Sequence, residues 1–170
     1  VGASGYSTNT GRAYIFYNDG HLAPSAVNAD VVITGAGTNN YFGFSFASGD
    51  FNADGRVDLA IGAYGAASNA GRAYLFYNDG SIPVTAATAD LTITGTSSND
   101  FFAWSLASGD FNADGKTDLA AGAYYATAGT STGISYLFYN DGSIPTTAAT
   151  ADVIITGETT SDLFGTSLVS

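Results

Sequence analysis

Short apolar runs separated by glycine-containing turns recur along the whole chain. Each unit of sixty residues carries four such runs, and each run is bounded by glycine, asparagine or aspartate. This pattern predicts β-strands rather than helices. In the central unit we expect strands at residues 42–47, 58–63, 72–77 and 91–95. The next unit repeats the first two at residues 102–107 and 118–123.

The regular spacing shows that these strands belong to an internal repeat. The turn sequence Tyr-Asn-Asp-Gly occurs at residues 17–20, 77–80 and 139–142, and the last unit is two residues longer in its loop at 126–132. Four antiparallel strands per unit predict the blades of a β-propeller, in which radial repetition leaves only short exposed sheet edges. Tandem β-sandwiches are the alternative, although the unit is too short for a sandwich of seven strands.

No segment has the 3.6-residue period of an amphipathic helix. Residues 24–28, 84–88 and 146–150 have room for one short helical turn each. We therefore predict an all-β chain.

A nine-residue acidic loop lies between the first and second strands of two units. It reads Asp-Phe-Asn-Ala-Asp-Gly-Arg-Val-Asp at residues 50–58 and Asp-Phe-Asn-Ala-Asp-Gly-Lys-Thr-Asp at residues 110–118. Oxygen-bearing side chains stand at positions 1, 3, 5 and 9, and glycine stands at position 6, where the chain must turn sharply. The beginning matches the calcium loop of EF-hands, but here the last acid leads into a strand instead of a helix.

These residue types favour calcium as the ligand of the loop. Three carboxylates this close repel one another unless a cation lies between them, and oxygen ligands without histidine or cysteine suit calcium better than zinc or copper. A metal-free turn rich in Asp and Asn is the alternative, because these are also common turn residues. The second copy keeps every expected ligand, which favours calcium.

We predict two calcium sites. The expected ligands of the first are the side chains of Asp50, Asn52, Asp54 and Asp58 with the carbonyl of Arg56. The expected ligands of the second are the side chains of Asp110, Asn112, Asp114 and Asp118 with the carbonyl of Lys116.

Composition narrows the classes of partner. The 170 residues include fifteen acidic against four basic residues, a formal net charge of −11. Such a surface argues against nucleic acid and anionic membranes, and no apolar run is long enough to span a bilayer. The absence of cysteine excludes disulfides, thiolate metal sites and cysteine nucleophiles. The chain opens on Val-Gly-Ala, so we expect any targeting segment to have been removed or never included.

The motifs also carry a family resemblance. Phe-Gly-x-Ser, Gly-Asp-Phe-Asn-x-Asp-Gly-x-x-Asp-Leu, Gly-Ala-x and Gly-Arg-Ala-Tyr-Leu-Phe follow one another in this order. The series resembles the FG-GAP repeat of integrin α-subunit propellers and their bacterial relatives, with Phe102-Ala103 in place of Phe-Gly in one unit and no proline after Gly-Ala. The resemblance implies a calcium-stabilised propeller, usually of seven blades, that serves in adhesion or as an accessory to secreted enzymes.

The expected strands divide the chain unequally. Residues 1–35 supply the second, third and fourth strands of a blade, residues 36–95 and 96–157 supply one complete blade each with a calcium loop, and residues 158–170 supply the first strand of a further blade. The total is about three blade equivalents, fewer than the roughly four to eight that usually close a propeller.

Three explanations of this count remain open. The sequence is part of a longer propeller, or separate copies associate head to tail. In the second case the strand at 163–169 of one copy adds to the 1–35 sheet of the next and builds a ring or a filament. A self-contained monomer of three blades is the least favoured, because it would expose long strand edges.

Nothing in the sequence predicts catalysis. No G-x-S-x-G nucleophile elbow stands out, and His21 is expected to be a solvated loop residue. Trp104 is expected in the core. Tyr6, Tyr64, Tyr124 and Tyr125 follow the Gly-Ala motif, where connections reach one rim of a propeller, and a ligand site is expected there if there is one.

We therefore predict a non-catalytic, calcium-stabilised module outside the cell or at its surface, where free calcium is plentiful. The module would serve in adhesion or in binding a protein or glycan. The alternatives are a structural subunit assembled head to tail and, less favoured, an accessory domain of a secreted enzyme.

Overall fold

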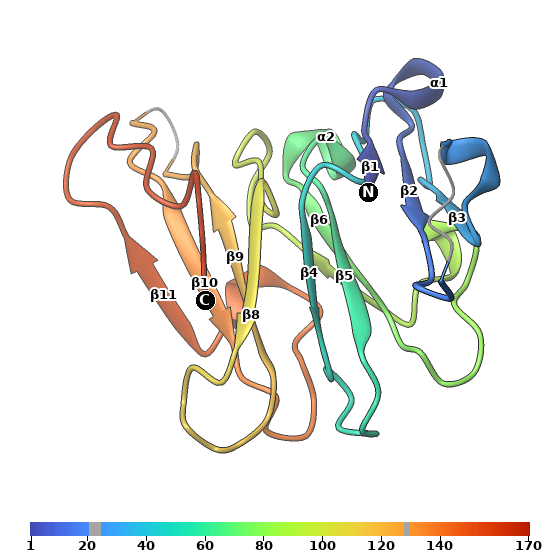
Figure 1. Ribbon diagram of the computed structural model, residues 1–170. Helices are drawn as coiled ribbons and strands as arrows, with labels where there is room; N and C mark the ends of the chain where they lie inside the picture. Colours follow the sequence, from blue (N-terminus) through green and yellow to red (C-terminus); the bar gives the residue numbers. More distant parts are fainter. Residues whose placement is uncertain (21–24, 128–129) are drawn as a thin grey trace.

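The computed structural model describes residues 1–20, 25–127 and 130–170. In this part of the chain eleven strands form three antiparallel sheets (Figure 1). The first sheet contains β1 (Gly2–Ala3), β2 (Arg12–Ile15) and β3 (Val31–Thr34). The second contains β4 (Phe46–Gly49), β5 (Asp58–Ala63), β6 (Arg72–Phe76) and β7 (Leu91–Thr94). The third contains β8 (Ser105–Gly109), β9 (Asp118–Ala123), β10 (Ile134–Phe138) and β11 (Val153–Thr156).

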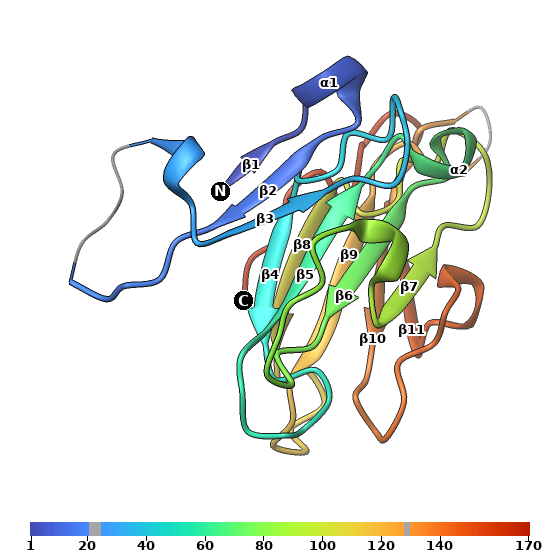
Figure 2. The same cartoon turned by 90° about the vertical axis from the view of Figure 1, so that its right-hand side faces the viewer.

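Each sheet is a simple meander of strands that are consecutive in sequence. The orders are β1-β2-β3, β4-β5-β6-β7 and β8-β9-β10-β11. Registers repeat as well, because Ile61 lies opposite Tyr74 in the second sheet and Ala121 lies opposite Tyr136 in the third. The sheets stand side by side like neighbouring blades and do not close into a ring (Figures 1 and 2). The all-β, blade-like architecture expected from the sequence is confirmed.

The hydrophobic cores lie between neighbouring sheets. Phe42 and Phe76 meet edge to face at 6.2 Å between the first and second sheets. Phe102 and Phe138 meet in the same way at 6.1 Å between the second and third. All four rings are fully buried. Burial of these apolar side chains away from water is the main favourable contribution to the packing of one blade against the next.

Serine hydroxyls link successive blades near β4 and β8. The Oγ of Ser45 donates to the carbonyl of Ala103 at 2.7 Å, and the Oγ of Ser105 donates to the carbonyl of Gly165 at 2.6 Å. Gly62 is required at this approach, because a Cβ there would overlap the carbonyl oxygen of Ala103. Ser45 therefore ties the start of β4 to the chain that leads into β8, and Ser105 ties the start of β8 to the segment 158–170.

The first strand of each complete blade begins later than the sequence predicts. β4 begins at Phe46 and β8 at Ser105, whereas we expected strands from residues 42 and 102. Tyr41 and Gly43 have positive φ angles of 56° and 82°, which take the chain out of the sheet. Phe42 instead forms an isolated parallel bridge with Gly11 of the preceding blade.

Residues 158–170, expected to supply the first strand of a further blade, form no strand. A strand requires a hydrogen-bonded neighbour, and Phe164 has only an isolated bridge to Gly133. The membership of this segment in a further blade stays a prediction.

The three expected helical turns are present as 3-10 turns: η1 (Ala26–Asn28), η2 (Ala86–Thr88) and η3 (Ala148–Thr150). Two further turns, α1 (Tyr6–Asn9) and α2 (Ala66–Asn69), were not expected. Both contain consecutive residues with positive φ, so a search for the period of a right-handed helix does not find them. His21 and Pro24 lie outside the described residues.

Candidate functional site

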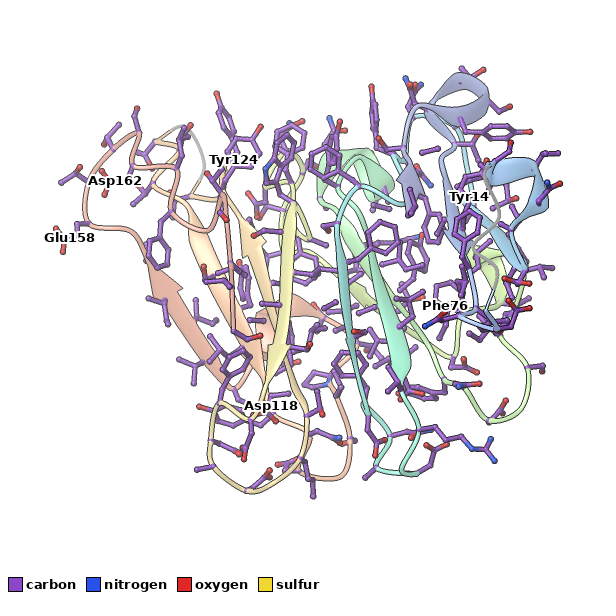
Figure 3. The ribbon with its side chains drawn as sticks, in the orientation of Figure 1. Tyr14, Phe76, Asp118, Tyr124, Glu158 and Asp162 are labelled. Carbon is purple, nitrogen blue, oxygen red and sulfur yellow. The ribbon has the colours of Figure 1, made fainter. Side chains whose placement is uncertain are left out.

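The two acidic loops connect β4 to β5 and β8 to β9 at the same end of the molecule. In Figure 1 both loops lie at the bottom, and α1 and α2 lie at the top. Figure 3 shows Asp118 at the loop end and Tyr124 at the opposite rim. The predicted calcium ligands and the predicted ligand-binding tyrosines therefore occupy opposite ends of the blades.

Main-chain N–H groups fill the inside of the first loop. The carboxylate of Asp50 accepts hydrogen bonds from the N–H of Asp54 at 3.0 Å and of Gly55 at 2.8 Å. The Oδ1 of Asn52 accepts from the N–H of Asp54 at 3.0 Å, and Asp54 accepts from the N–H of Arg56 at 2.8 Å. The loop is thus a series of turns closed by side-chain oxygens, for which Asp and Asn are well suited.

Asp58 anchors the loop to the sheet. Its Oδ2 accepts the N–H of Phe51 at 2.9 Å, and its Oδ1 accepts the N–H of Asn78 at 2.8 Å. Burial raises the pKa of Asp58, the two hydrogen bonds lower it in part, and the carboxylates of Asp54 and Asp50 raise it further. A buried negative charge beside two others is unfavourable unless a positive charge is added.

The second loop has the same hydrogen-bond pattern. Asp110 accepts from the N–H of Asp114 at 3.0 Å and of Gly115 at 2.9 Å, and Asp114 accepts from the N–H of Lys116 at 2.9 Å. Asn112 accepts from the N–H of Asp114 at 3.0 Å, and Asp118 accepts from the N–H of Phe111 at 2.8 Å. Identical geometry in two loops of different sequence at positions 7 and 8 shows that the shared acids, Asn and Gly determine the shape.

The donor set fits calcium in its chemistry. Every expected side-chain ligand is an oxygen, and a carboxylate oxygen that accepts one N–H keeps a second lone pair for another partner. As they stand, no three acidic or histidine side chains in the described ranges form a group ready to hold a metal ion. Calcium binding at the ten named residues therefore stays a prediction.

Seven aromatic side chains form a continuous row at the rim opposite the loops. Tyr41 stacks on Tyr64 at 4.7 Å, Phe44 meets Trp104 at 4.5 Å, and Trp104 meets Tyr124 at 4.5 Å. We call this row the aromatic ladder. Its members are Tyr41, Phe44, Tyr64, Phe101, Trp104, Tyr124 and Tyr125.

The ladder corrects one sequence prediction and extends another. Trp104 is half-buried among rim aromatics and not in the core, because it precedes β8 where the chain leaves the sheet. Tyr6 is not among these ring contacts; the guanidinium of Arg12 lies 3.8 Å from the centre of its ring. Tyr41, Phe44 and Phe101 also belong to the ladder and were not predicted as rim residues. Their positions in the repeat could have indicated them: Tyr41 and Phe101 directly precede Phe42 and Phe102, and Phe44 directly follows the Phe42-Gly43 pair.

The ladder is accessible to solvent and confined to the second and third blades. Phe44 is 39% exposed and Tyr125 is 46% exposed, and the other members are half-buried. At the position of Phe44 and Trp104 the next copy of the motif has Thr166. Burial, followed by neighbouring tyrosines, raises the pKa of Tyr64 and of Tyr124. The two hydroxyls therefore stay protonated, and available as hydrogen-bond donors, through the physiological range.

No helix in the described part of the chain is long and apolar enough to cross a membrane.

Comparison with known proteins adds two results. A family profile described as FG-GAP repeat matches residues 42–76 and 102–138. Mouse phosphatidylinositol-glycan-specific phospholipase D is 32% identical over 185 residues, which cover 99% of this chain and 22% of that protein.

Integrin α subunits are also similar. Integrin alpha-PS5 of Drosophila melanogaster is 36% identical over 126 residues, covering 71% of this chain and 12% of the integrin. Mouse integrin alpha-IIb is 39% identical over 95 residues, covering 51% and 9%. The chain spans less than a quarter of each relative. The order of its motifs, its repeated four-stranded sheets and the two matched segments place the chain in the FG-GAP repeat family.

Proposed function

We propose that this chain is a non-catalytic, calcium-stabilised FG-GAP module that binds a glycan or protein through the aromatic ladder, outside the cell or at its surface. The observation that carries the proposal is the separation of two features. Oxygen-rich loops lie at one end of the blades, and exposed aromatic rings lie at the other (Figure 3).

Calcium would act on the fold at the loop end. Each loop presents three carboxylates and one amide, and Asp58 is buried with its pKa raised. The side chains of Asp50, Asn52, Asp54 and Asp58 would hold an ion in the first loop, and the corresponding residues would do so in the second. The ion would supply the positive charge that the buried carboxylate lacks. Free calcium at the required level is typical of extracellular surroundings, which supports that location.

The ladder supports binding at the rim. Exposed aromatic groups together with a few fixed polar groups are typical of ligand sites. Side-chain amides lie beside the ladder: Asn69 donates to Asn99 at 3.0 Å, and Asn9 donates to the hydroxyl of Tyr41 at 3.1 Å. Aromatic faces stack on the C–H faces of sugars, and amides bond to sugar hydroxyls. A neutral glycan is therefore the first ligand to test.

The test uses Trp104, the single tryptophan, as a fluorescent reporter inside the ladder. Neutral oligosaccharides are titrated in the presence of calcium, and we expect a saturable change in emission for at least one of them. Phe44→Ala and Tyr125→Ala should weaken that binding at least roughly tenfold, which is about 1.4 kcal/mol. The control Val84→Ala changes an exposed apolar residue outside the ladder and should leave binding unchanged. Equal binding by Phe44→Ala and wild type would refute a ligand site on the ladder.

The similarity to part of a phospholipase D supports a second candidate, an accessory domain of a larger secreted enzyme. Two observations would distinguish the accessory domain from the independent binding module. An accessory domain should be encoded together with a catalytic domain, and the binding of a neighbouring domain should compete with glycan at the ladder.

A further inference from the structure

The start of the first acidic loop lies against the second loop, although the two loops belong to different blades. The hydroxyl of Ser108 in β8 donates to the carbonyl of Ser48 in β4 at 2.7 Å. Gly49 directly precedes the first loop, and a Cβ there would overlap the Cγ2 of Thr117 in the second loop. The first loop therefore begins where its chain passes directly beside the second.

Asn140, in the turn that follows β10, bonds to both loops. Its main-chain N–H donates at 2.9 Å to the Oδ1 of Asp118, the last acid of the second loop. Its side-chain amide donates at 3.5 Å to the carbonyl of Asp50, the first residue of the first loop. In Figure 1 this turn lies between the two loops, and Asn140 is only 4% exposed. One buried residue thus joins an expected ligand of one site to an expected ligand of the other.

The first loop is seated on the third blade as well as on its own. Phe51 directly follows Asp50, and its buried side chain lies in one cluster with Phe138 and Ile144 of the third blade. The N–H of Phe51 donates to Asp58, the acid that closes the same loop. The third blade therefore helps to fix the main chain at the first two positions of the first loop.

The contact at Asn140 has room to tighten. A cavity of about 340 Å³ lies beside it, and its lining includes Asn52 of the first loop and Lys116 of the second. The bond from the amide of Asn140 to Asp50 is longer than the usual N–H···O distance of about 2.9–3.0 Å. A small movement of either loop can therefore strengthen or weaken it.

We propose that the two calcium sites are coupled through Asn140, so that calcium in one loop tightens binding in the other. This inference rests on the calcium sites of the proposed function. Asp118 is held more firmly when its loop is filled, and it then fixes Asn140, whose amide holds the main chain of Asp50. The first loop loses less conformational freedom when it fills in turn, which strengthens binding. Coupling between two sites is reciprocal, so a filled first loop tightens the second by the same factor.

The test compares three proteins by isothermal titration calorimetry with calcium, after removal of the ion by chelator. Asp54→Ala leaves only the second site intact and Asp114→Ala only the first, and both residues are exposed. For independent sites, the wild-type constant for binding both ions equals the product of the two single-site constants. We expect the wild-type constant to exceed that product about fivefold or more.

Asn140→Ala identifies the residue that carries the coupling. The change keeps the main-chain bond to Asp118 and removes the amide, so the excess over the product should fall to about one while both sites still bind. The matched control is Asn78→Ala, because the main-chain N–H of Asn78 bonds to Asp58 in the same way. This control should keep the wild-type excess. Repulsion between two bound ions opposes the coupling, but it is shared by the wild type and both variants.

The outcomes separate this inference from the proposed function. Two ions that bind the wild type independently would overturn the coupling and leave the calcium sites in place, whereas no calcium binding would overturn both. An unchanged excess in Asn140→Ala would overturn the role of Asn140. Far-UV circular dichroism checks that Asn140→Ala is folded. If it is not, Ser108→Ala removes the other hydrogen bond between the two blades at this end and should lower the excess, and an unchanged excess there would overturn coupling through this contact.

Discussion

The carboxylate of Asp58 and the backbone N–H of Phe51 close the first acidic loop with a hydrogen bond of 2.9 Å. Asp118 and Phe111 repeat this bond at 2.8 Å in the second loop. The last acid of each loop is also the first residue of a strand, so the same side chain fixes the loop and begins the sheet. The loops are therefore part of the blade framework and not independent appendages.

Asp58→Ala should destabilise the fold even without calcium. The change removes the acceptor of the N–H groups of Phe51 and Asn78, and a buried donor left unpaired costs about 1–3 kcal/mol. Part of this cost is offset, because the buried charge is removed at the same time. We expect a net loss of roughly 1–3 kcal/mol by urea unfolding in excess chelator.

Two further variants control the measurement at Asp58. Asp58→Asn keeps one carbonyl oxygen and should lose less stability than Asp58→Ala. Asp79→Ala removes an exposed turn acid and should change little. If Asp58→Ala and Asp79→Ala unfolded at the same urea concentration, the anchoring role of Asp58 would be wrong.

Trp104→Ala should weaken the contact between the second and third blades. The indole meets Phe44, Tyr64 and Tyr124 at 4.5–4.7 Å, and each aromatic pair contributes about 0.5–1.5 kcal/mol beyond burial. Trp104→Phe installs the residue of the other complete blade and should retain most of the stability. Thermal unfolding followed by far-UV circular dichroism measures both, and equal melting of the two variants would contradict the packing role.

Tyr136 should make the protein sensitive to alkaline pH. Burial raises the pKa of Tyr136, the bond to Thr96 lowers it in part, and Asp100 raises it again. The unfolded chain releases this proton near pH 10 and the folded chain only above that. The contribution to stability is therefore complete below about pH 10 and is lost as the pH rises through the higher folded pKa.

The check is the free energy of unfolding between about pH 8 and pH 11. Tyr136→Phe should lose stability less steeply than the wild type at the alkaline end. The exposed Tyr17 provides the control, since Tyr17→Phe should follow the wild type. If the free energy of unfolding of Tyr136→Phe fell as steeply with pH as that of the wild type, groups other than Tyr136 would cause the loss of stability at alkaline pH.

Local sequence patterns predicted the strands well where each strand is bounded by its own turn. Asp58–Ala63 and Asp118–Ala123 match the expected bounds, because the last acid of the loop begins each strand and a Gly-Ala pair ends the apolar run. The start of β4 was predicted wrongly, because the strand was expected from residue 42 and begins at Phe46. The run beginning at Phe42 is apolar, yet Phe42 packs between blades, and only the tertiary structure reveals this.

The aromatic rim was predicted only in part for a similar reason. Tyr64 and Tyr124 follow a motif that marks the rim, so their position could be inferred from the sequence. Trp104 lies in an apolar run that reads as core, and no periodicity distinguishes a ring above the sheet from a ring inside it. The sharp turn of the acidic loops was predictable, since Gly55 and Gly115 both have the positive φ that glycine tolerates.

Binding of two calcium ions by the acidic loops is the central claim, and thermal unfolding with and without calcium tests it most directly. At a calcium concentration one hundred times the Kd, each site should add about 2.7 kcal/mol, and two sites should raise Tm by roughly 10–20 °C over the chelated protein. Asp54→Ala or Asp114→Ala should remove about half of this shift, and the double variant should remove nearly all of it. If the calcium-loaded and chelated wild-type proteins melted at the same temperature, the loops would not be calcium sites.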